Sequence, residues 1–188
     1  MAEMSPHSDD TQGLLAAIRR YESPLVGYAA RLLGDADRAR DVVQDTFLAL
    51  CRTNGSVPAC RTGEWLFTVC RNRAVDVLRK ERRMHAMADP PRVPTPPGAE
   101  PDQQAQQRET FGRVAQAVHG LPPNQQDVLR LKFQHGFAYK QIARITGLSV
   151  SNVGYLLHVA VGTLRREFAR QGLLDTALGK DGTHASQA

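Results

Sequence analysis

Four side chains near the start of one amphipathic segment can donate or accept hydrogen bonds, and the helical pattern places them on its outward face. They are Ser151, Asn152, Tyr155 and His158. Hydroxyl, amide and imidazole groups of this kind can read the edges of DNA bases in the major groove. Two arginines that suit phosphate contacts, Arg165 and Arg166, follow toward the far end of the segment. The pattern therefore predicts contact with duplex DNA.

Two helices joined by a tight turn are expected to hold these side chains. In the first helix, Ile142 and Ile145 recur at helical spacing. Gly147 can adopt the left-handed conformation that ends a helix, and Ser149 can accept a hydrogen bond from a free amide of the next. The second helix has one apolar stripe, formed by Val153, Leu157, Ala160, Leu164 and Phe168. This is the pattern of a helix-turn-helix, which places its second helix in the major groove; the alternative is an ordinary pair of core-packing helices.

Two glycines, Gly154 and Gly162, fall inside the second helix. Glycine in a helix interior costs about 0.5–1 kcal/mol relative to alanine. Their presence predicts either close packing of the helix against a neighbour or some plasticity in it.

Residues 36–51 predict an earlier helix with two chemically different sides. Gly34 ends the preceding helical pattern, and Asp35 can cap the new helix, with Asp37 favourably placed in its first turn. The apolar side comprises Ala39, Val42, Val43, Thr46, Phe47 and Leu50, and the opposite side comprises Asp37, Asp41, Gln44, Asp45 and Leu48. A solvated acidic face is the simplest interpretation. The alternative is a basic partner, because an acidic row should face away from DNA.

Residues 64–83 predict a long helix that carries the densest positive charge in the chain. Its inner side is formed by Leu66, Cys70, Ala74 and Val77. Another side, spaced at i, i+4, i+7 and i+11, contains Asn72, Asp76, Arg79 and Arg83, and Arg82 adds to the charge. From the residues alone, a solvated cationic face and a nucleic-acid contact are equally good interpretations.

Composition divides the chain into five segments and predicts an all-α fold with two small helical domains, 11–84 and 108–170. Residues 1–10 are polar and expected to be disordered, and 171–188 form a tail. In the first domain, Pro24 is expected to bend or divide the helix over 11–33. The segment 85–107 is a linker, because six of the eleven prolines lie between Pro90 and Pro101 and QQAQQ follows. Extended at about 3.1 Å per residue, it could span about 70 Å.

Several classes of site have no support in the sequence. The net charge of +5 allows a nucleic-acid partner. Cys51, Cys60 and Cys70 form no CxxC pair, so we expect free thiols, with no metal and no cofactor. We find no nucleophile with a base and an orienting group, and no phosphate-binding loop, and therefore expect no enzymatic activity. With neither a membrane span nor an export signal apparent, we expect a cytoplasmic protein.

Three runs in a fixed order carry a resemblance to a known family. They are DVVQDTF at 41–47, WLFTVCRNRAVDVLRK at 65–80, and LPPNQQDVLRLKF with QIARITGLSVSNV at 121–153. Across 14–168 the chain resembles the extracytoplasmic-function (ECF) group of bacterial RNA polymerase sigma factors. The resemblance implies a subunit that binds core polymerase, directs it to promoters and helps to separate the strands. It also implies that the two domains are sigma regions 2 and 4. Many members of the family are held inactive by an anti-sigma protein, so the resemblance allows such a partner for this chain too.

The resemblance assigns roles to the polar side chains of these helices. The helix over 36–51 would dock on the clamp helices of the polymerase beta-prime subunit through Asp41, Gln44, Asp45 and Leu48. The helix over 64–83 would read and help open the minus-ten element through Asn72, Asp76, Arg79, Arg82 and Arg83. The helix-turn-helix would read the minus-thirty-five element through Ser151, Asn152, Tyr155, His158, Arg165 and Arg166. Trp65 would either pack in the core, which its apolar surroundings favour, or stack on an unpaired base.

The chain departs from the family pattern in its recognition helix. Gly154, Tyr155 and Leu156 stand where relatives commonly have basic or small polar residues, which predicts fewer phosphate contacts there. Two other functions stay open. One is a conventional helix-turn-helix regulator that acts without binding core polymerase. The other is an interaction module that sequesters a protein through the face over 41–48.

Overall fold

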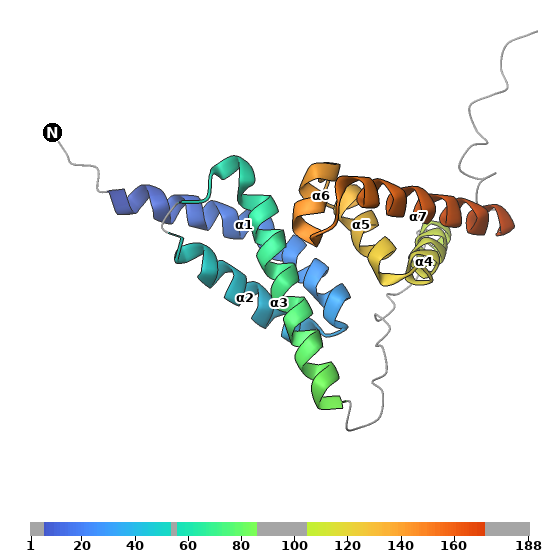
Figure 1. Cartoon of the computed structure of the whole chain (residues 1–188), viewed down its shortest axis with the longest axis horizontal. Coiled ribbons are helices and arrows are strands. Elements are labelled where there is room, and N and C mark those ends of the chain that lie inside the picture. The colour runs from blue at the N-terminus through green and yellow to red at the C-terminus, as the bar shows by residue number, and fades with distance from the viewer. Residues whose placement is uncertain (1–5, 54–55, 86–104, 172–188) are drawn as a thin grey trace, which may run out of the picture. The chain divides into compact units, whose positions relative to one another are not determined.

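The computed structural model describes residues 6–53, 56–85 and 105–171. Helices account for nearly all of this part of the chain, which contains no strand, so the all-α prediction is confirmed (Figure 1). In order they are α1 (Pro6–Leu33), α2 (Ala36–Cys51), the short 3-10 helix η1 (Ala59–Arg61), α3 (Thr62–His85), α4 (Ala105–His119), α5 (Pro123–Phe133), α6 (Tyr139–Thr146) and α7 (Val150–Arg170).

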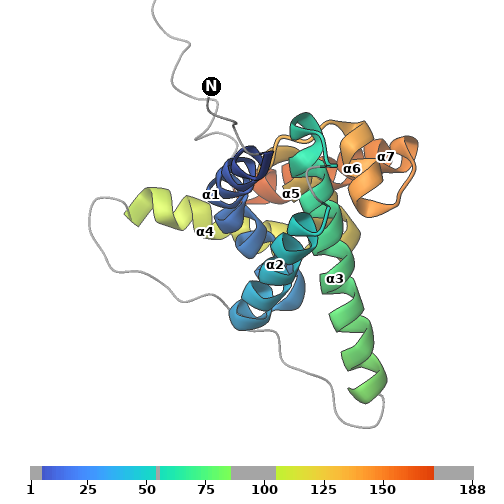
Figure 2. The same cartoon turned by 90° about the vertical axis from the view of Figure 1, so that its left-hand side faces the viewer.

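Backbone contacts divide the chain into two compact units. The first is Met1–Pro97 with Arg144–Gly147, and the second is Gly98–Ala143 with Leu148–Ala188. In the first unit, α1, α2 and α3 pack against one another, as Figure 2 shows. In the second unit, α4 and α5 both pack against α7. Two small helical units are therefore present, as the composition predicts.

The first helix differs from the expectation at two places. α1 begins at Pro6, within the segment predicted to be disordered, and residues 1–5 lie outside the described part. It also runs through Pro24 as a single helix, so the predicted division there is wrong. Leu25, Tyr28 and Ala29, which follow the proline, are fully buried. Their burial offsets the hydrogen bond that Pro24 cannot donate.

The core of the first unit forms where α1, α2 and α3 meet. Five of the six apolar-side residues predicted in α2 are buried, and Leu50 is half-buried. The ring of Tyr28 lies 5.2 Å from that of Phe67, measured between centroids. Leu66, Cys70 and Ala74 are fully buried on the inner side of α3. Val77, the last residue of the predicted inner side of α3, is half-buried. The predicted core faces of α2 and α3 are thus confirmed apart from the partial exposure of Leu50 and Val77.

The predicted linker is partly helical. α4 begins at Ala105, whereas we expected helix only from residue 108. The remainder of the linker, apart from His85 at the end of α3, lies outside the described residues, as does the tail after 171. The helical pattern that resumes near Arg108 predicts that Val114 and Ala115 face inward. Both are exposed in the structure, which corrects that part of the predicted core. In the described part, α4 packs mainly against α7, so it cannot bury every apolar residue that it carries.

Three glycines in the left-handed conformation follow helices α1, α5 and α6, and two of them, Gly34 and Gly147, are the helix ends that the sequence predicts. Gly34, Gly136 and Gly147 have φ angles of 71°, 71° and 74°. They end α1, the turn after α5, and α6, respectively. Ile142 and Ile145 of α6 are buried, as are Val153, Leu157 and Ala160 of α7, while Leu164 and Phe168 are half-buried. The helix-turn-helix is therefore present with the turn and stripe that its sequence predicts.

Candidate nucleic-acid interface and partner surface

The beginning of α7 is fixed by a capping residue. Ser149 has extended backbone angles, φ −71° and ψ 153°, and its side-chain oxygen accepts a hydrogen bond from the backbone amide of Asn152 at 3.2 Å. This cap satisfies one of the free amides of the first turn. It thereby fixes the rotation at which the side chains of α7 emerge.

All four predicted base-reading side chains are exposed on the first half of α7. They are Ser151, Asn152, Tyr155 and His158, and Tyr155 is 65% exposed. The stripe of Val153, Leu157 and Ala160 is buried on the opposite side. Because the apolar stripe holds the helix in place, the polar face is presented as one rigid surface.

The far half of α7 is basic and exposed. Arg165 and Arg166 both reach solvent, and an Arg166 Nη2 donates to the hydroxyl of Thr163 at 3.2 Å. The next basic side chain, Arg170, forms an ion pair with Glu167 and is partly neutralised by it. Of these arginines, Arg165 and Arg166 suit contacts with phosphate.

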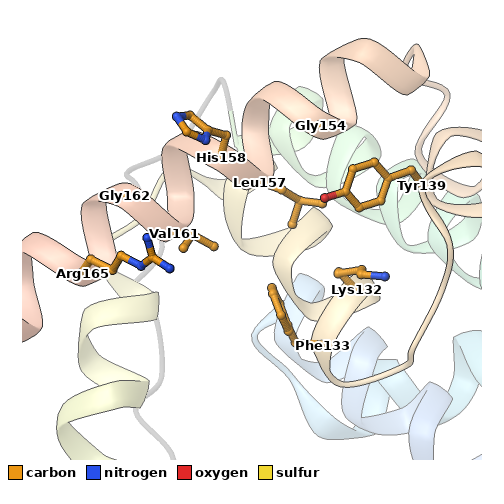
Figure 3. Close-up of a pocket in the computed structure, with 9 residues that line it drawn as sticks. All are labelled: Lys132, Phe133, Tyr139, Gly154, Leu157, His158, Val161, Gly162 and Arg165. Atoms are coloured by element: carbon orange, nitrogen blue, oxygen red, sulfur yellow. The ribbon is translucent and has the colours of Figure 1, made fainter. Parts of the chain in front are cut away.

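A cavity of about 300 Å³ lies beside this surface in the second unit. Figure 3 shows its lining, which comprises Lys132, Phe133, Tyr139, Gly154, Leu157, His158, Val161, Gly162 and Arg165. The ammonium nitrogen of Lys132 lies 5.5 Å from the centroid of the Tyr139 ring. Two predicted DNA contacts, His158 and Arg165, thus line a cavity that the sequence did not indicate. Four more of its lining residues belong to α7, and the remaining three come from α5 and α6, whose relation to α7 depends on tertiary packing.

Close packing does not explain the two glycines of α7. A Cβ atom added at Gly154 would lie 3.7 Å from the Tyr139 ring, which is an ordinary contact, and one added at Gly162 would meet nothing within 4 Å. The close packing offered as one explanation of these glycines is therefore absent.

A second candidate surface lies on α2. Asp41, Gln44, Asp45 and Leu48 are all exposed on the side opposite the buried residues, and Leu48 is 47% exposed. Asp45 accepts a hydrogen bond from an Nη1 of Arg73 on α3 at 2.8 Å. The structure therefore brings the four predicted partner-binding residues together as one acidic face with an apolar side chain in it.

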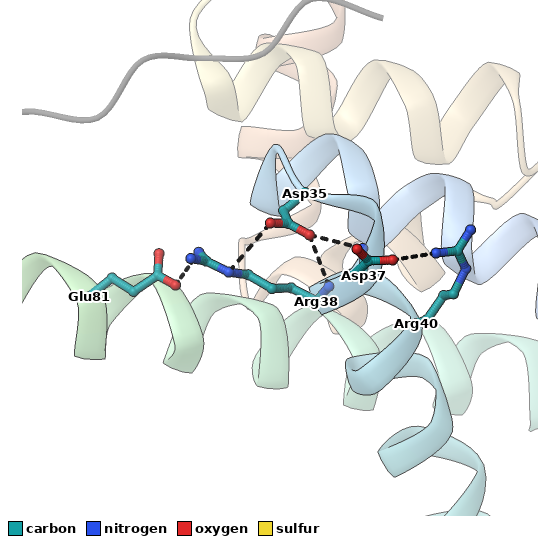
Figure 4. Close-up of polar contacts among 5 residues, drawn as sticks. All are labelled: Asp35, Asp37, Arg38, Arg40 and Glu81. Atoms are coloured by element: carbon teal, nitrogen blue, oxygen red, sulfur yellow. Dashed lines mark hydrogen bonds and ion pairs between the residues drawn. The ribbon is translucent and has the colours of Figure 1, made fainter.

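The start of α2 is anchored to α3 by a polar network (Figure 4). An oxygen of Asp35 accepts hydrogen bonds from the backbone amides of Asp37 and Arg38 at 2.9 and 3.0 Å. Arg38 in turn forms an ion pair with Glu81 of α3. The hydrogen bond from the Arg38 amide is the main cause that holds the pKa of Asp35 below its ordinary value of 3.8, and the Asp37 amide and the Arg38 charge lower it further. This network positions α2 relative to α3.

The predicted nucleic-acid residues of α3 form an exposed polar surface. Asn72, Asp76, Arg79, Arg82 and Arg83 all reach solvent, and Asp76 lies 3.8 Å from an Arg79 nitrogen. Trp65, at the start of the helix, is half-buried. This degree of burial does not decide between packing in the core and stacking on a base. The side chains can therefore meet a nucleic-acid backbone without rearrangement of the helix.

The cysteines are free where the structure describes them. Cys51 and Cys60 are exposed and Cys70 is buried. Burial raises the pKa of the Cys70 thiol to about 12, opposed by a hydrogen bond with Thr46.

Among the described residues, no group of three or more His, Cys, Asp or Glu side chains could hold a metal ion. No single described helix is long and apolar enough to cross a bilayer, although α6 and α7 pass that test as a pair bent by 102°.

Comparison with known proteins identifies both units. A model of sigma-70 region 2 matches residues 17–84, and a model of sigma-70 region 4 matches residues 111–164. The ECF RNA polymerase sigma factor SigL of Mycobacterium tuberculosis is 30% identical over 176 residues, which cover 92% of this chain and 99% of SigL. The RNA polymerase sigma factor CarQ of Myxococcus xanthus is 29% identical over 80% of this chain and 90% of CarQ.

Two solved structures share the fold. The sigma factor RpoE, crystallised with the anti-sigma factor NepR from Bartonella quintana, superposes with a TM-score of 0.64. It is 24% identical, and the match covers 86% of this chain and 97% of that one. CnrH, solved in complex with the cytosolic domain of CnrY, gives a TM-score of 0.56 at 22% identity over 89% of this chain and 95% of CnrH.

Proposed function

Because this chain belongs to the ECF RNA polymerase sigma factors, which bind core polymerase and direct promoter-specific transcription initiation, we propose that separate surfaces of its two units perform these tasks. Full-length similarity to SigL carries the family assignment. A helix-turn-helix regulator that acts alone would have no need of a region 2, so the sigma function is favoured over that alternative. The proposed surfaces are three exposed faces, one each on α2, α3 and α7.

The exposed face of α2 is the proposed contact with core polymerase. Asp41, Asp45 and Gln44 offer carboxylate and amide groups to a basic partner, and the half-exposed Leu48 offers apolar area at the same place. Charged groups around an apolar contact give orientation and rapid association. We assign this face to the clamp helices of the beta-prime subunit.

The exposed surface of α3 is the proposed minus-ten contact. Arg79, Arg82 and Arg83 suit phosphate, while Asn72 and Asp76 can form hydrogen bonds with bases. Capture of unpaired bases on this surface would favour strand separation, because a ligand that binds only the open form shifts the equilibrium toward it.

The exposed face of α7 is the proposed minus-thirty-five contact. Ser151, Asn152, Tyr155 and His158 would meet base edges, and Arg165 and Arg166 would meet phosphates. Few basic residues lie in the first half of the helix. We therefore expect this unit to hold DNA weakly unless the polymerase positions it.

We propose 11–84 and 108–170 as the bounds of the two domains, and the matches at 17–84 and 111–164 support this proposal. The linker over 85–107 would let the two units reach separate promoter elements. We propose that the protein acts in the bacterial cytoplasm, where the polymerase and its DNA are. We also propose that it has no catalytic activity of its own, since the polymerase forms the phosphodiester bonds. Since RpoE was crystallised with an anti-sigma factor, we extend such a partner to this chain as well.

Charge reversal on α2 tests the docking assignment. Asp45→Arg should weaken binding to core polymerase at least about tenfold, equivalent to about 1.4 kcal/mol, because like charges would then face each other. Glu22→Arg is the matched control, since Glu22 is exposed on α1, outside the proposed face. Binding can be measured by fluorescence anisotropy of the labelled chain, with circular dichroism to verify the helices. Wild-type affinity for Asp45→Arg, or an equal loss in both variants, would rule out this face.

A further inference from the structure

A side chain of the DNA-facing helix is neutralised by a side chain of the polymerase-facing helix. The Nη1 atom of Arg73 on α3 lies 2.8 Å from the Oδ2 atom of Asp45 on α2. The pair is at the surface, with 35% of the Arg73 side chain and 58% of the Asp45 side chain exposed. Both groups can therefore be reached by larger partners without unfolding of either helix.

Arg73 lies at the border between α2 and the predicted DNA-binding stripe of α3. Successive residues of an α-helix are rotated by about 100°, so Arg73 is next to the stripe of Asn72, Asp76, Arg79 and Arg83 but turned toward α2. Lys80, seven residues later, is exposed on the same side of α3. An arginine in this position can point either to α2 or to a nucleic-acid backbone that follows the stripe.

Asp45 has two competing partners under the proposed docking role. A carboxylate that meets a basic group of the polymerase cannot keep its full interaction with Arg73. Once Asp45 pairs with a basic group of the polymerase, the guanidinium of Arg73 no longer has a carboxylate partner and can bind another anion. The anion that the neighbouring stripe would bring to it is a DNA phosphate.

We propose that Arg73 is a further contact with the promoter backbone, neutralised by Asp45 in the free chain and released when core polymerase engages Asp45. This proposal rests on the docking role of the α2 face. It explains why the free protein should bind DNA with lower affinity than the holoenzyme does. It also requires the two binding steps to be coupled through one side chain.

The size of the coupling depends on the exposure of the pair. Ion pairs between exposed side chains contribute at most about 1 kcal/mol, so releasing this one should change an affinity by at most about fivefold. A phosphate contact has a separate signature. The slope of log affinity against log salt is negative, and each phosphate contact increases its magnitude by about 0.9 for duplex DNA and about 0.7 for single strands.

The variant Arg73→Ala separates the proposal from a purely structural role. It should tighten binding to core polymerase about two- to fivefold, because Asp45 no longer has to leave a partner. In holoenzyme assembled at saturating core, it should weaken promoter binding and reduce the magnitude of the salt slope by about 0.7–0.9. Arg73→Lys should restore most of the slope. If Arg73 merely supported the packing of α2 on α3, Arg73→Ala would weaken both steps, and that result would overturn the proposal.

Asp45→Asn tests the free chain, with a matched control on the same helix. Asp37 is also exposed on α2, but its carboxylate forms an ion pair at 2.5 Å with Arg40 of the same helix, whereas Asp45 pairs with a residue of α3. In the absence of polymerase, Asp45→Asn should raise affinity for duplex DNA about two- to fivefold more than Asp37→Asn. In the double variant with Arg73→Ala, this excess should vanish. Equal gains from the two asparagine variants would contradict the proposal.

Two remaining outcomes identify what failed. If Arg73→Ala tightens core binding but leaves the holoenzyme salt slope unchanged, Arg73 does not contact DNA and the proposal is wrong while the docking face stands. If the wild-type chain does not bind core polymerase at all, the proposed function itself fails.

Discussion

The side-chain oxygen of Ser149 and the backbone amide of Asn152 are joined by a hydrogen bond of 3.2 Å across the first turn of α7. This bond determines where the helix begins and therefore which side chains of its first turns face outward. Asn152 and His158 are exposed because they lie on the side of α7 away from the buried Val153 and Leu157. The promoter reading that we propose for α7 thus uses a helix whose first turn is capped by a residue of the preceding turn.

Removal of a base-reading side chain should change promoter choice more than general affinity. In Asn152→Ala or His158→Ala, each lost base contact should cost about 1–3 kcal/mol at promoters that use it and little elsewhere. Initiation from a panel of promoters that vary only in the minus-thirty-five element measures this. Asn124→Ala and His119→Ala, at exposed positions outside α7, are the controls. A uniform loss on every promoter would mean that the base readers lie elsewhere.

Two glycine substitutions in the helix-turn-helix, one inside α7 of the second unit and one in the turn that precedes α7, should shift stability in opposite directions. Gly162→Ala should be stabilising by about 0.5–1 kcal/mol, because the helix gains propensity and the added methyl meets no atom within 4 Å. Gly147→Ala should be destabilising by about 1–2 kcal/mol, because the φ angle of 74° is strained for alanine. Urea unfolding followed by circular dichroism gives both values. Shifts of the same sign would contradict the conformations described for these positions.

Acidification should remove the contribution of the α2 cap. The pKa of Asp35 is lower in the folded chain than its ordinary value of 3.8, chiefly because its carboxylate accepts the hydrogen bond from the Arg38 amide. Its contribution to stability is therefore complete above pH 3.8 and is lost as the pH falls through the folded-state pKa. Asp35→Asn keeps an oxygen acceptor but cannot titrate.

The free energy of unfolding of Asp35→Asn should consequently depend less on pH than that of the wild type in this acidic range. Asp41→Asn, which removes a carboxylate that caps no helix, serves as the comparison. Identical pH profiles for wild type and Asp35→Asn would show that the cap does not have the assigned role.

The three cysteines should differ in reactivity. At neutral pH a disulfide-forming reagent should label Cys51 and Cys60 rapidly, since both are exposed. Cys70 should react only on unfolding, because it is buried and its pKa is raised to about 12, which leaves almost no thiolate. Mass spectrometry of the labelled chain measures each site, and the urea-unfolded chain provides the value for full labelling. Rapid labelling of Cys70 in the folded chain would contradict its burial.

Much of this architecture is determined by local signals. Gly147 and Ser149 predict the turn of the helix-turn-helix because left-handed glycines and capping serines act within a few residues. Helical periodicity alone predicts the two sides of α2. These are also the features that place the candidate surfaces on α2 and α7.

Other features depend on how the helices pack, which the sequence does not display. Helix α1 continues through Pro24 because Leu25 and Tyr28 are buried against other helices. Asp45 and Arg73 are 28 residues apart, and their ion pair arises only when α2 and α3 meet. The cavity beside His158 and Arg165 likewise needs residues from three helices. In each case tertiary contacts decide the outcome.

In-vitro transcription with the purified chain and core polymerase is the decisive test of the proposed sigma function. A pooled library of promoters, with sequencing of the transcript starts, reports both initiation and selectivity. We expect the wild-type chain to make core polymerase start at defined sites that share minus-thirty-five and minus-ten elements. Asp45→Arg should lose these starts, while Glu22→Arg should keep them. Transcript starts that are the same with and without the chain would show that the protein is not a sigma factor.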